Sequence, residues 1–235
     1  MTLDEVMAEL AAKGNETTKR TLMKHGAKEP FFGVRIGDMK PLHKKLRGEQ
    51  ALALQLFATG NGDAQYLAGM IADGGKMTAA QLRTWAKTAS WQMISGTTLP
   101  WVAQEHPEGF DLALEWIDSP KPRIAVSGWN TLGALAATKP DAELPLKQYG
   151  ALLDRVAKEI AKAHDDVRYA MNNFIINCGT YLAPLGDKAI ATARKVGKVE
   201  IDMGDTACKV PDAESYIIKA RRGAPVAAKR KTTRC

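Results

Sequence analysis

The stretch Pro122-Arg123-Ile124-Ala125-Val126 and the stretch Val167-Arg168-Tyr169-Ala170-Met171 can be laid over each other at an offset of 45 residues. Each is followed by a long apolar run with helical spacing, in which Trp129 matches Phe174. A period in the forties is typical of stacked helical hairpins, whose units bury their apolar faces against their neighbours. The sequence therefore predicts a stack of paired helices with one long working surface.

Composition and turn signals extend this prediction to the whole chain. Ala, Leu, Lys and Glu are abundant while aromatic residues make up only 6% of the chain, a mix that favours helices over strands. Short loops such as Asn61-Gly62 and Ser119-Pro120 separate the apolar runs. We expect an all-α fold, a HEAT- or armadillo-like right-handed α-α superhelix. After a first helix that ends before Gly14, helices are expected over about 38–46, 49–58, 63–72, 78–88, 92–104, 107–117, 121–137, 144–163, 166–182 and 185–196.

The C-terminal part of the chain loses the helical period. Residues 199–211 show turn residues without helical spacing, and Pro211 suits the first position of a last helix. The final dozen residues mix Pro, Ala, Lys and Arg, a composition typical of a mobile tail. We predict a helical-repeat domain over 1–198, an ordered loop and final helix packed on the repeats over 199–222, and a basic mobile tail over 223–235.

Positive charge is concentrated near the two ends of the chain. The net charge is +7, and seven Lys and Arg residues follow the last acid, Glu214. Residues 13–47 hold ten Lys and Arg against three acids. On a curved stack such ends could grip a polyanion through phosphate contacts. The alternative is a solvated helix face with a solubilising tail.

Several classes of protein are disfavoured by the same composition. No apolar run approaches the roughly 20 residues that span a bilayer, and an acidic N-terminus argues against a secretory leader. The three cysteines, Cys178, Cys208 and Cys235, are far apart and lack metal-ligand spacing. We expect a cytoplasmic monomer with reduced thiols, no metal and no cofactor, and no serine–histidine triad or phosphate-binding glycine motif is present.

Several short motifs occur along the chain in a characteristic order. They are the segment Glu29-Pro30-Phe31-Phe32-Gly33-Val34-Arg35, the helix from Asp38 to Leu46, the pair Ser90-Trp91, and the helices that carry Arg123 and Arg168. In that order they resemble the bacterial DNA alkylation repair family, the AlkD-like HEAT-repeat DNA glycosylases. Asp38 is expected to cap its helix.

The resemblance implies excision of cationic alkylated purines without moving the base into a pocket. A charged purine leaves readily, so the protein mainly stabilises positive charge on the sugar. In the family, a carboxylate four residues after a tryptophan and a second tryptophan in a later repeat serve that purpose. Trp91 matches the first tryptophan, but Ser95 stands at the carboxylate position and Asn173 at the second tryptophan position. The chain is thus expected to be a divergent member that lacks the usual catalytic aspartate.

Several residues are candidates for contact with nucleic acid. Trp91 can line such a contact, although a tryptophan at a helix start is about as often a core residue. Arg123 and Arg168 can meet phosphates, or each can pair with an acid such as Asp118 or Asp166. Trp85, Trp101, Trp116 and Trp129 are expected to pack between helices. The remaining candidates for nucleic-acid contact are Asn173, Arg35, Lys40, Lys44 and Lys45.

The loop after residue 199 holds the remaining cluster of reactive groups. Asp202 and Asp205 lie near Cys208 and could supply catalysis that Ser95 cannot, if the loop folds over the working surface. The interpretation we favour is local turns around Gly204 with Cys208 as a buried filler. Ser95 itself can hydrogen-bond a phosphate, a water or a sugar.

The sequence thus predicts a protein that binds duplex DNA on a basic concave face. Damage recognition, with weak or altered alkylpurine glycosylase activity or with none, is the leading functional hypothesis. An alternative from another class is a non-enzymatic adaptor whose groove holds a protein partner.

Overall fold

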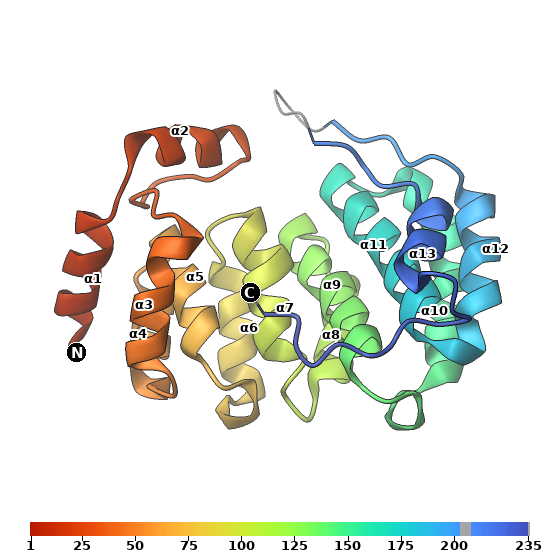
Figure 1. The fold of residues 1–235 in the computed structure, drawn as a ribbon, viewed down its shortest axis with the longest axis horizontal. Coiled ribbons are helices and arrows are strands. Elements are labelled where there is room, and N and C mark those ends of the chain that lie inside the picture. Colours follow the sequence, from red (N-terminus) through yellow and green to blue (C-terminus); the bar gives the residue numbers. More distant parts are fainter. Residues whose placement is uncertain (203–207, 235) are drawn as a thin grey trace. The chain divides into compact units, whose positions relative to one another are not determined.

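A computed structural model describes residues 1–202 and 208–234, and these residues form helices and connecting turns without a strand (Figure 1). The predicted all-α class is therefore confirmed. The α-helices are α1 Leu3–Ala12, α2 Glu16–Lys24, α3 Ile36–Leu46, α4 Gln50–Ala58, α5 Gly62–Ile71, α6 Ala79–Thr88, α7 Leu99–Ala103, α8 Gly109–Ile117, α9 Pro122–Thr138, α10 Leu146–Glu159, α11 Asp165–Tyr181, α12 Gly186–Val196 and α13 Ala213–Arg221.

The chain divides into two compact units, and the boundary lies between Leu112 and Ala113 inside α8. Unit 1 contains residues 1–112 and Arg234, and unit 2 contains the described residues from 113 to 233. The division falls within the segment 1–198 that the sequence predicted as one domain. None of the helices in the described ranges has the length and hydropathy of a membrane span.

Unit 1 is built on aromatic contacts between consecutive hairpins. Phe57 of α4 stacks on Trp85 of α6 with ring centroids 3.9 Å apart, and Tyr66 of α5 meets the edge of Trp101 of α7 at 5.4 Å. Such aromatic pairs add to the free energy gained by burying apolar surface. The side chain of each of these four residues is buried, as the sequence predicted for the two tryptophans.

The two sequence-matched stretches form the centre of unit 2. They open α9 and α11, and the matched aromatics Trp129 and Phe174 are both fully buried with ring centroids 5.2 Å apart. Tyr149 of α10 packs on the same Phe174 ring and donates its hydroxyl hydrogen to the Leu132 carbonyl at 2.9 Å. The repeat therefore corresponds to equivalent core positions.

Two helix starts differ from the expected ones. Helix α3 begins at Ile36 and Arg35 is its N-cap, so Asp38 lies in the first turn and does not cap the helix. Helix α13 begins at Ala213, and the Asp212 carboxylate accepts the Ser215 N–H at 2.9 Å. Pro211 precedes that cap, because a polar residue that can satisfy an orphan N–H competes better for the cap position.

The helix expected over 92–104 is not continuous. A π-helical turn, Ile94–Thr98, precedes α7. Pro100 is the second residue of α7, and its lack of an N–H removes one donor from the α-helical ladder. A local change of helix type at such a place is a common adjustment.

Three cations of the C-terminal region hydrogen-bond to carbonyl oxygens at helix C-termini. Within unit 2, Arg221 donates to the Gly179 carbonyl of α11 at 2.6 and 2.9 Å, and Lys229 donates to the Ala136 carbonyl of α9 at 2.8 Å. Within unit 1, Arg234 donates to three carbonyls at the end of α5 at 2.7 to 3.2 Å. Each cation satisfies orphan acceptors at the negative end of a helix dipole. The sequence predicted a mobile tail over 223–235; in the structure Ala227, Lys229, Arg230 and Arg234 hydrogen-bond to helix carbonyls.

Candidate nucleic-acid interface

Ser95 lies in the π-helical turn of unit 1 and Trp91 shortly precedes that turn, and both residues are buried. Trp91 is 6% exposed, and a β-carbon placed on Gly62 would lie 3.3 Å from its indole nitrogen. Ser95 is 0% exposed, and its hydroxyl lies 3.4 Å from the Trp91 carbonyl and 3.3 Å from the Gln92 carbonyl. A serine bonded back onto its own helix in this way satisfies its hydroxyl locally. Their roles in nucleic-acid contact and catalysis stay predictions.

The segment Glu29–Arg35, which carries part of the family resemblance, is fixed by Asp63 at the start of α5. The Asp63 carboxylate accepts the N–H groups of Phe32, Gly33 and Val34, the last two at 3.0 Å. Burial raises the pKa of Asp63, and the three N–H groups oppose that rise. No local pattern in the sequence points to Asp63, because its hydrogen-bond partners lie about thirty residues earlier in the chain.

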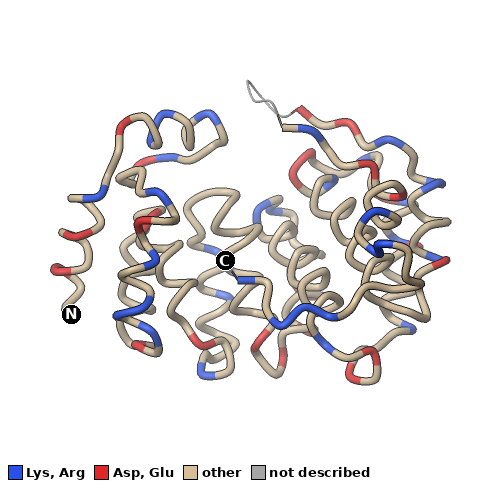
Figure 2. The backbone as a smooth tube through the Cα atoms, viewed as in Figure 1, with Lys and Arg blue, Asp and Glu red and all other residues tan. Residues whose placement is uncertain are grey.

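The basic segment near the N-terminus presents its cations to solvent. Lys40, Lys44 and Lys45 are exposed on α3, and Arg35 is exposed at its N-cap. The blue positions along α2 and α3 in Figure 2 mark this concentration of charge. Lys19 is an exception, because it forms a salt bridge with Glu29 at 2.6 Å and lies over the Phe31 ring. Arg35 and the three exposed lysines of α3, all of them predicted contacts, are therefore accessible to phosphates.

Arg123 and Arg168 occupy matched places but different environments. Arg123 is exposed in the first turn of α9, and the acid considered as its partner, Asp118, pairs with Arg155 at 2.7 Å. Arg168 is partly buried and pairs with Asp165 at 3.3 Å, not with Asp166. Asp165 therefore partly neutralises the charge of the half-buried Arg168, whereas Arg123 is exposed.

The loop carboxylates are only partly within the described residues. Asp202 is exposed and its N–H donates to the Asp165 carboxylate at 2.9 Å, an interaction that lowers the pKa of Asp165. Asp205 lies outside the described residues. Cys208 is exposed, so its interpretation as a buried filler is wrong. The buried thiol is Cys178 on α11, and burial raises its pKa.

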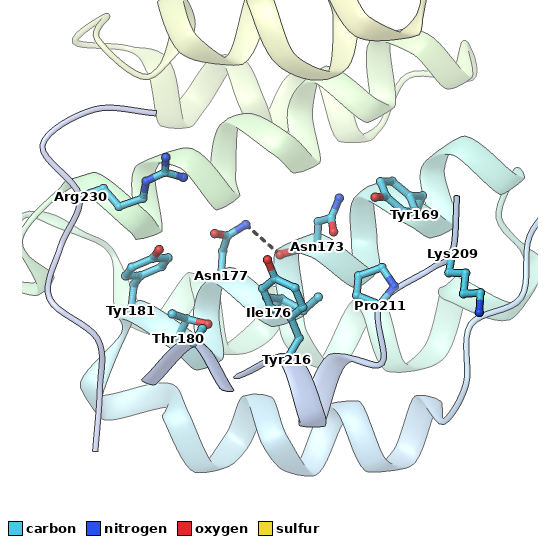
Figure 3. A pocket seen from close by; sticks show the side chains of 11 residues that line it. Tyr169, Asn173, Ile176, Asn177, Thr180, Tyr181, Lys209, Pro211, Tyr216 and Arg230 are labelled. Atoms are coloured by element: carbon cyan, nitrogen blue, oxygen red, sulfur yellow. Dashed lines mark hydrogen bonds between the residues drawn. The ribbon is translucent and has the colours of Figure 1, made fainter. Parts of the chain in front are cut away.

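A polar groove lies between α11 and α13 in unit 2 (Figure 3). Its volume is about 400 Å³. Asn173 and Tyr169 of α11 face the groove together with Tyr216 of α13, while Arg230 and Lys209 lie toward opposite ends. We call this feature the α11–α13 groove. It brings the predicted contact Asn173 together with residues that the sequence analysis did not single out.

Two hydrogen bonds from asparagine side chains shape the α11–α13 groove. The Asn172 amide donates to the Pro211 carbonyl at 2.9 Å, which holds the start of the α13 segment on α11. The Asn177 amide donates to the backbone carbonyl of Asn173 at 2.9 Å, shown as a dashed line in Figure 3. The run Asn172-Asn173 was visible in the sequence as an unusual polar pair, but its two roles depend on side-chain direction. Asn172 is structural, whereas Asn173 lines the groove.

The two-unit helical fold, the buried tryptophan and the arginine-bearing helices α9 and α11 together define a helical-repeat protein of the type that the sequence resembles. The chain belongs to the family of DNA alkylation repair enzymes, and the sequence pattern of that family matches residues 6–207 of this chain.

Curated relatives and a solved structure agree with this assignment. An uncharacterised protein of Listeria innocua is 34% identical over 227 residues, covering 94% of this chain and 98% of its own. Another, from Listeria monocytogenes, is 33% identical with the same coverage. A solved structure is 34% identical, covers both chains fully and has a TM-score of 0.91. That structure represents a new family of proteins related to the HEAT-like repeat DNA glycosylases with affinity for branched DNA structures. The HEAT-like fold of this chain is thereby confirmed.

Proposed function

We propose that this protein binds DNA at branch points, using exposed cations to hold the phosphates of the duplex arms. The likeness to the solved structure with affinity for branched DNA carries this proposal. The match covers 100% of this chain and 100% of that chain, so the proposal does not depend on a single motif. Duplex DNA, the partner predicted from the sequence, is a component of such branches.

The distribution of positive charge supports phosphate binding in both units. In unit 1 the exposed lysines Lys40, Lys44 and Lys45 form one basic patch along α3. In unit 2 Arg123 is exposed at the first turn of α9. Phosphate contacts fix a protein on DNA without reading sequence, which suits recognition of shape rather than of base order. Arg221, Lys229 and Arg234 are not assigned to DNA, because helix carbonyls occupy them.

Base excision through a carboxylate at the Ser95 position is not part of the proposal. Ser95 has no negative charge, and its hydroxyl is buried against its own helix. We infer that the protein recognises DNA structure without the family's carboxylate mechanism. Release of free base from DNA that contains a methylated purine tests this inference directly. The native protein is expected to release none, and release that survives Ser95→Ala and stops in Asp205→Asn would assign chemistry to the loop instead.

Binding is tested by titrating a four-way DNA junction at several salt concentrations. Arg123→Ala and the combined Lys40→Ala, Lys44→Ala and Lys45→Ala variant are compared with Lys147→Ala, which removes an exposed cation on α10. The first two variants are expected to bind more weakly and to show a shallower salt dependence. The log–log slope should fall by about one unit for each phosphate that a removed cation neutralises in the native complex. Lys147→Ala is expected to behave as the native protein.

Two results would contradict the proposal. Equal losses in log affinity for each cation removed, Lys147 included, would mean that net charge, and not these positions, determines binding. A native protein that retains no junction DNA at low salt would leave the adaptor hypothesis as the better account.

A further inference from the structure

The α11–α13 groove has the chemistry of a site for a negatively charged, flat ligand. Lys209 and Arg230 are its charged side chains, and no carboxylate is found among the described residues that line it. Neither cation forms an ion pair within residues 1–202 and 208–234. Elsewhere on the described surface cations often pair with a neighbouring acid, for example Lys188 with Asp154 at 2.7 Å. The groove therefore favours an anion.

Aromatic and hydrogen-bonding groups lie between the two cations. Tyr216 is 50% exposed, an unusual state for an aromatic side chain in this structure, and Figure 3 shows it beside Asn173 in the middle of the groove. Thr180 also lines the groove; it is 2% exposed, and its hydroxyl oxygen is buried without a hydrogen-bond partner. A buried hydroxyl without a partner costs free energy unless a ligand or water satisfies it. The groove thus offers a flat face and an unsatisfied polar atom together.

We propose that the α11–α13 groove holds one unpaired nucleotide of a DNA strand. The base lies against Tyr216, the Asn173 amide meets the base edge, and the phosphates on either side of the nucleotide lie near Lys209 and Arg230. This proposal rests on the proposed function, and it adds that the protein recognises a branch point partly through a base released from pairing.

Size and chemistry favour this occupant. A volume of about 400 Å³ lies near the lower end of the range of about 300–1,000 Å³ for small-ligand sites, which suits one nucleotide and not a duplex. Unpaired bases are recognised by stacking on aromatic side chains and by hydrogen bonds to their edges. Cations at opposite ends of the groove match a strand that carries a phosphate on each side of the base.

The test uses two junctions of the same sequence. One is fully paired, and the other has a single unpaired 2-aminopurine nucleotide at the branch point. The native protein is expected to bind the second junction more tightly and to quench its 2-aminopurine fluorescence by stacking. Tyr216→Ala is expected to weaken binding of the unpaired junction by about 5- to 150-fold, the loss of one base–aromatic stack, and to restore the fluorescence. Tyr216→Phe is expected to keep both properties.

The controls separate this proposal from the proposed function. Ile218→Ala removes another exposed side chain of α13, 57% exposed and outside the groove, and is expected to change neither affinity. Arg230→Ala is expected to weaken binding of the unpaired junction more than binding of the paired one. If Tyr216→Ala lowers the affinity for both junctions equally, or for neither, the nucleotide proposal is overturned while branch binding stands. If the native protein binds neither junction, both proposals fail.

Discussion

The side-chain amide of Asn172 donates a hydrogen bond to the backbone carbonyl of Pro211 across 39 residues of sequence, at 2.9 Å. Asn172 is 1% exposed and lies on α11, while Pro211 immediately precedes the cap of α13. The bond therefore joins the last helix to the helix that carries Arg168 and Asn173. It sets one wall of the α11–α13 groove.

Asn172→Ala is expected to lower the free energy of unfolding by about 1–3 kcal/mol, because the Pro211 carbonyl loses its partner inside the protein. The neighbouring change Asn173→Ala is the matched control. The Asn173 side chain lines the groove, and the bond that it receives from Asn177 ends on its backbone carbonyl. A change within about 0.5 kcal/mol is expected there. Denaturant titration measures both, and equal losses of stability would contradict the structural role of Asn172.

Substitution of Gly128 and of Gly150 by alanine is expected to change the stability of unit 2 in opposite directions. A β-carbon on Gly128 would lie 2.7 Å from the Ala113 carbonyl oxygen and 2.7 Å from a methyl carbon of Ile117. Gly128→Ala is expected to destabilise by about 1–3 kcal/mol, because α9 would have to move away from α8. On Gly150 of α10 the nearest atom would lie 3.7 Å away. Gly150→Ala is expected to stabilise by about 0.5–1 kcal/mol through helix propensity. The unfolding temperature of each variant is compared with that of the native protein. A shift of both temperatures in the same direction would contradict this packing.

Asp63 gives unit 1 a defined pH dependence. Burial raises the pKa of its carboxyl above the ordinary value of 3.8, so the folded state binds that proton more tightly than the unfolded state does. The corresponding stabilisation is fully present below pH 3.8 and is lost as the pH rises through the higher folded pKa. The stability of the native protein relative to Asp63→Asn is therefore expected to fall from acid to neutral pH. The difference between the free energies of unfolding of the two proteins cancels the contributions of the other titrating groups. A difference that rises or stays constant from acid to neutral pH would contradict the raised pKa of Asp63.

Ser95→Asp is expected to destabilise unit 1 rather than to create a working carboxylate. Ser95 is fully buried, and the new charge would lie beside the carbonyl oxygens of Trp91 and Gln92. A buried charge without a partner costs about 3–5 kcal/mol. Ser95→Ala adds no charge and removes the hydroxyl contacts with the Trp91 and Gln92 carbonyls, and it is expected to cost about 1 kcal/mol. Circular dichroism during thermal unfolding compares them, and native-like stability of Ser95→Asp would show that the site opens to solvent.

Much of the fold follows from patterns that are local in the sequence. The helix expected over 121–137 is α9, and the one expected over 166–182 is α11, because long apolar runs and short loops fix both ends. The matched pair Trp129 and Phe174 was found from the repeat alone and proved to be a direct contact. The π-helical turn was missed, since helical periodicity does not distinguish a widened turn from a regular one.

The candidate site was less predictable because its contacts are distant in sequence. The sequence placed Arg123 at the start of a helix and left open whether it meets phosphates or pairs with an acid such as Asp118; in the structure it is exposed and Asp118 pairs with Arg155. The α11–α13 groove required the approach of α13 to α11, which no local pattern encodes. For the C-terminal cations the sequence left two interpretations, a grip on a polyanion or a solubilising tail, yet Lys229 and Arg234 donate to helix carbonyls. Charge in a sequence shows neither which cations reach solvent nor which complete a helix end.

A preference of this protein for branched DNA over linear duplex is measured directly by competition. A labelled four-way junction bound to the native protein is challenged with an unlabelled linear duplex or with an unlabelled junction, each of equal length and composition, at physiological salt. The unlabelled junction is expected to displace the label at a lower concentration than the linear duplex does. Displacement by both DNAs at the same concentration would show that the protein has no preference for branches.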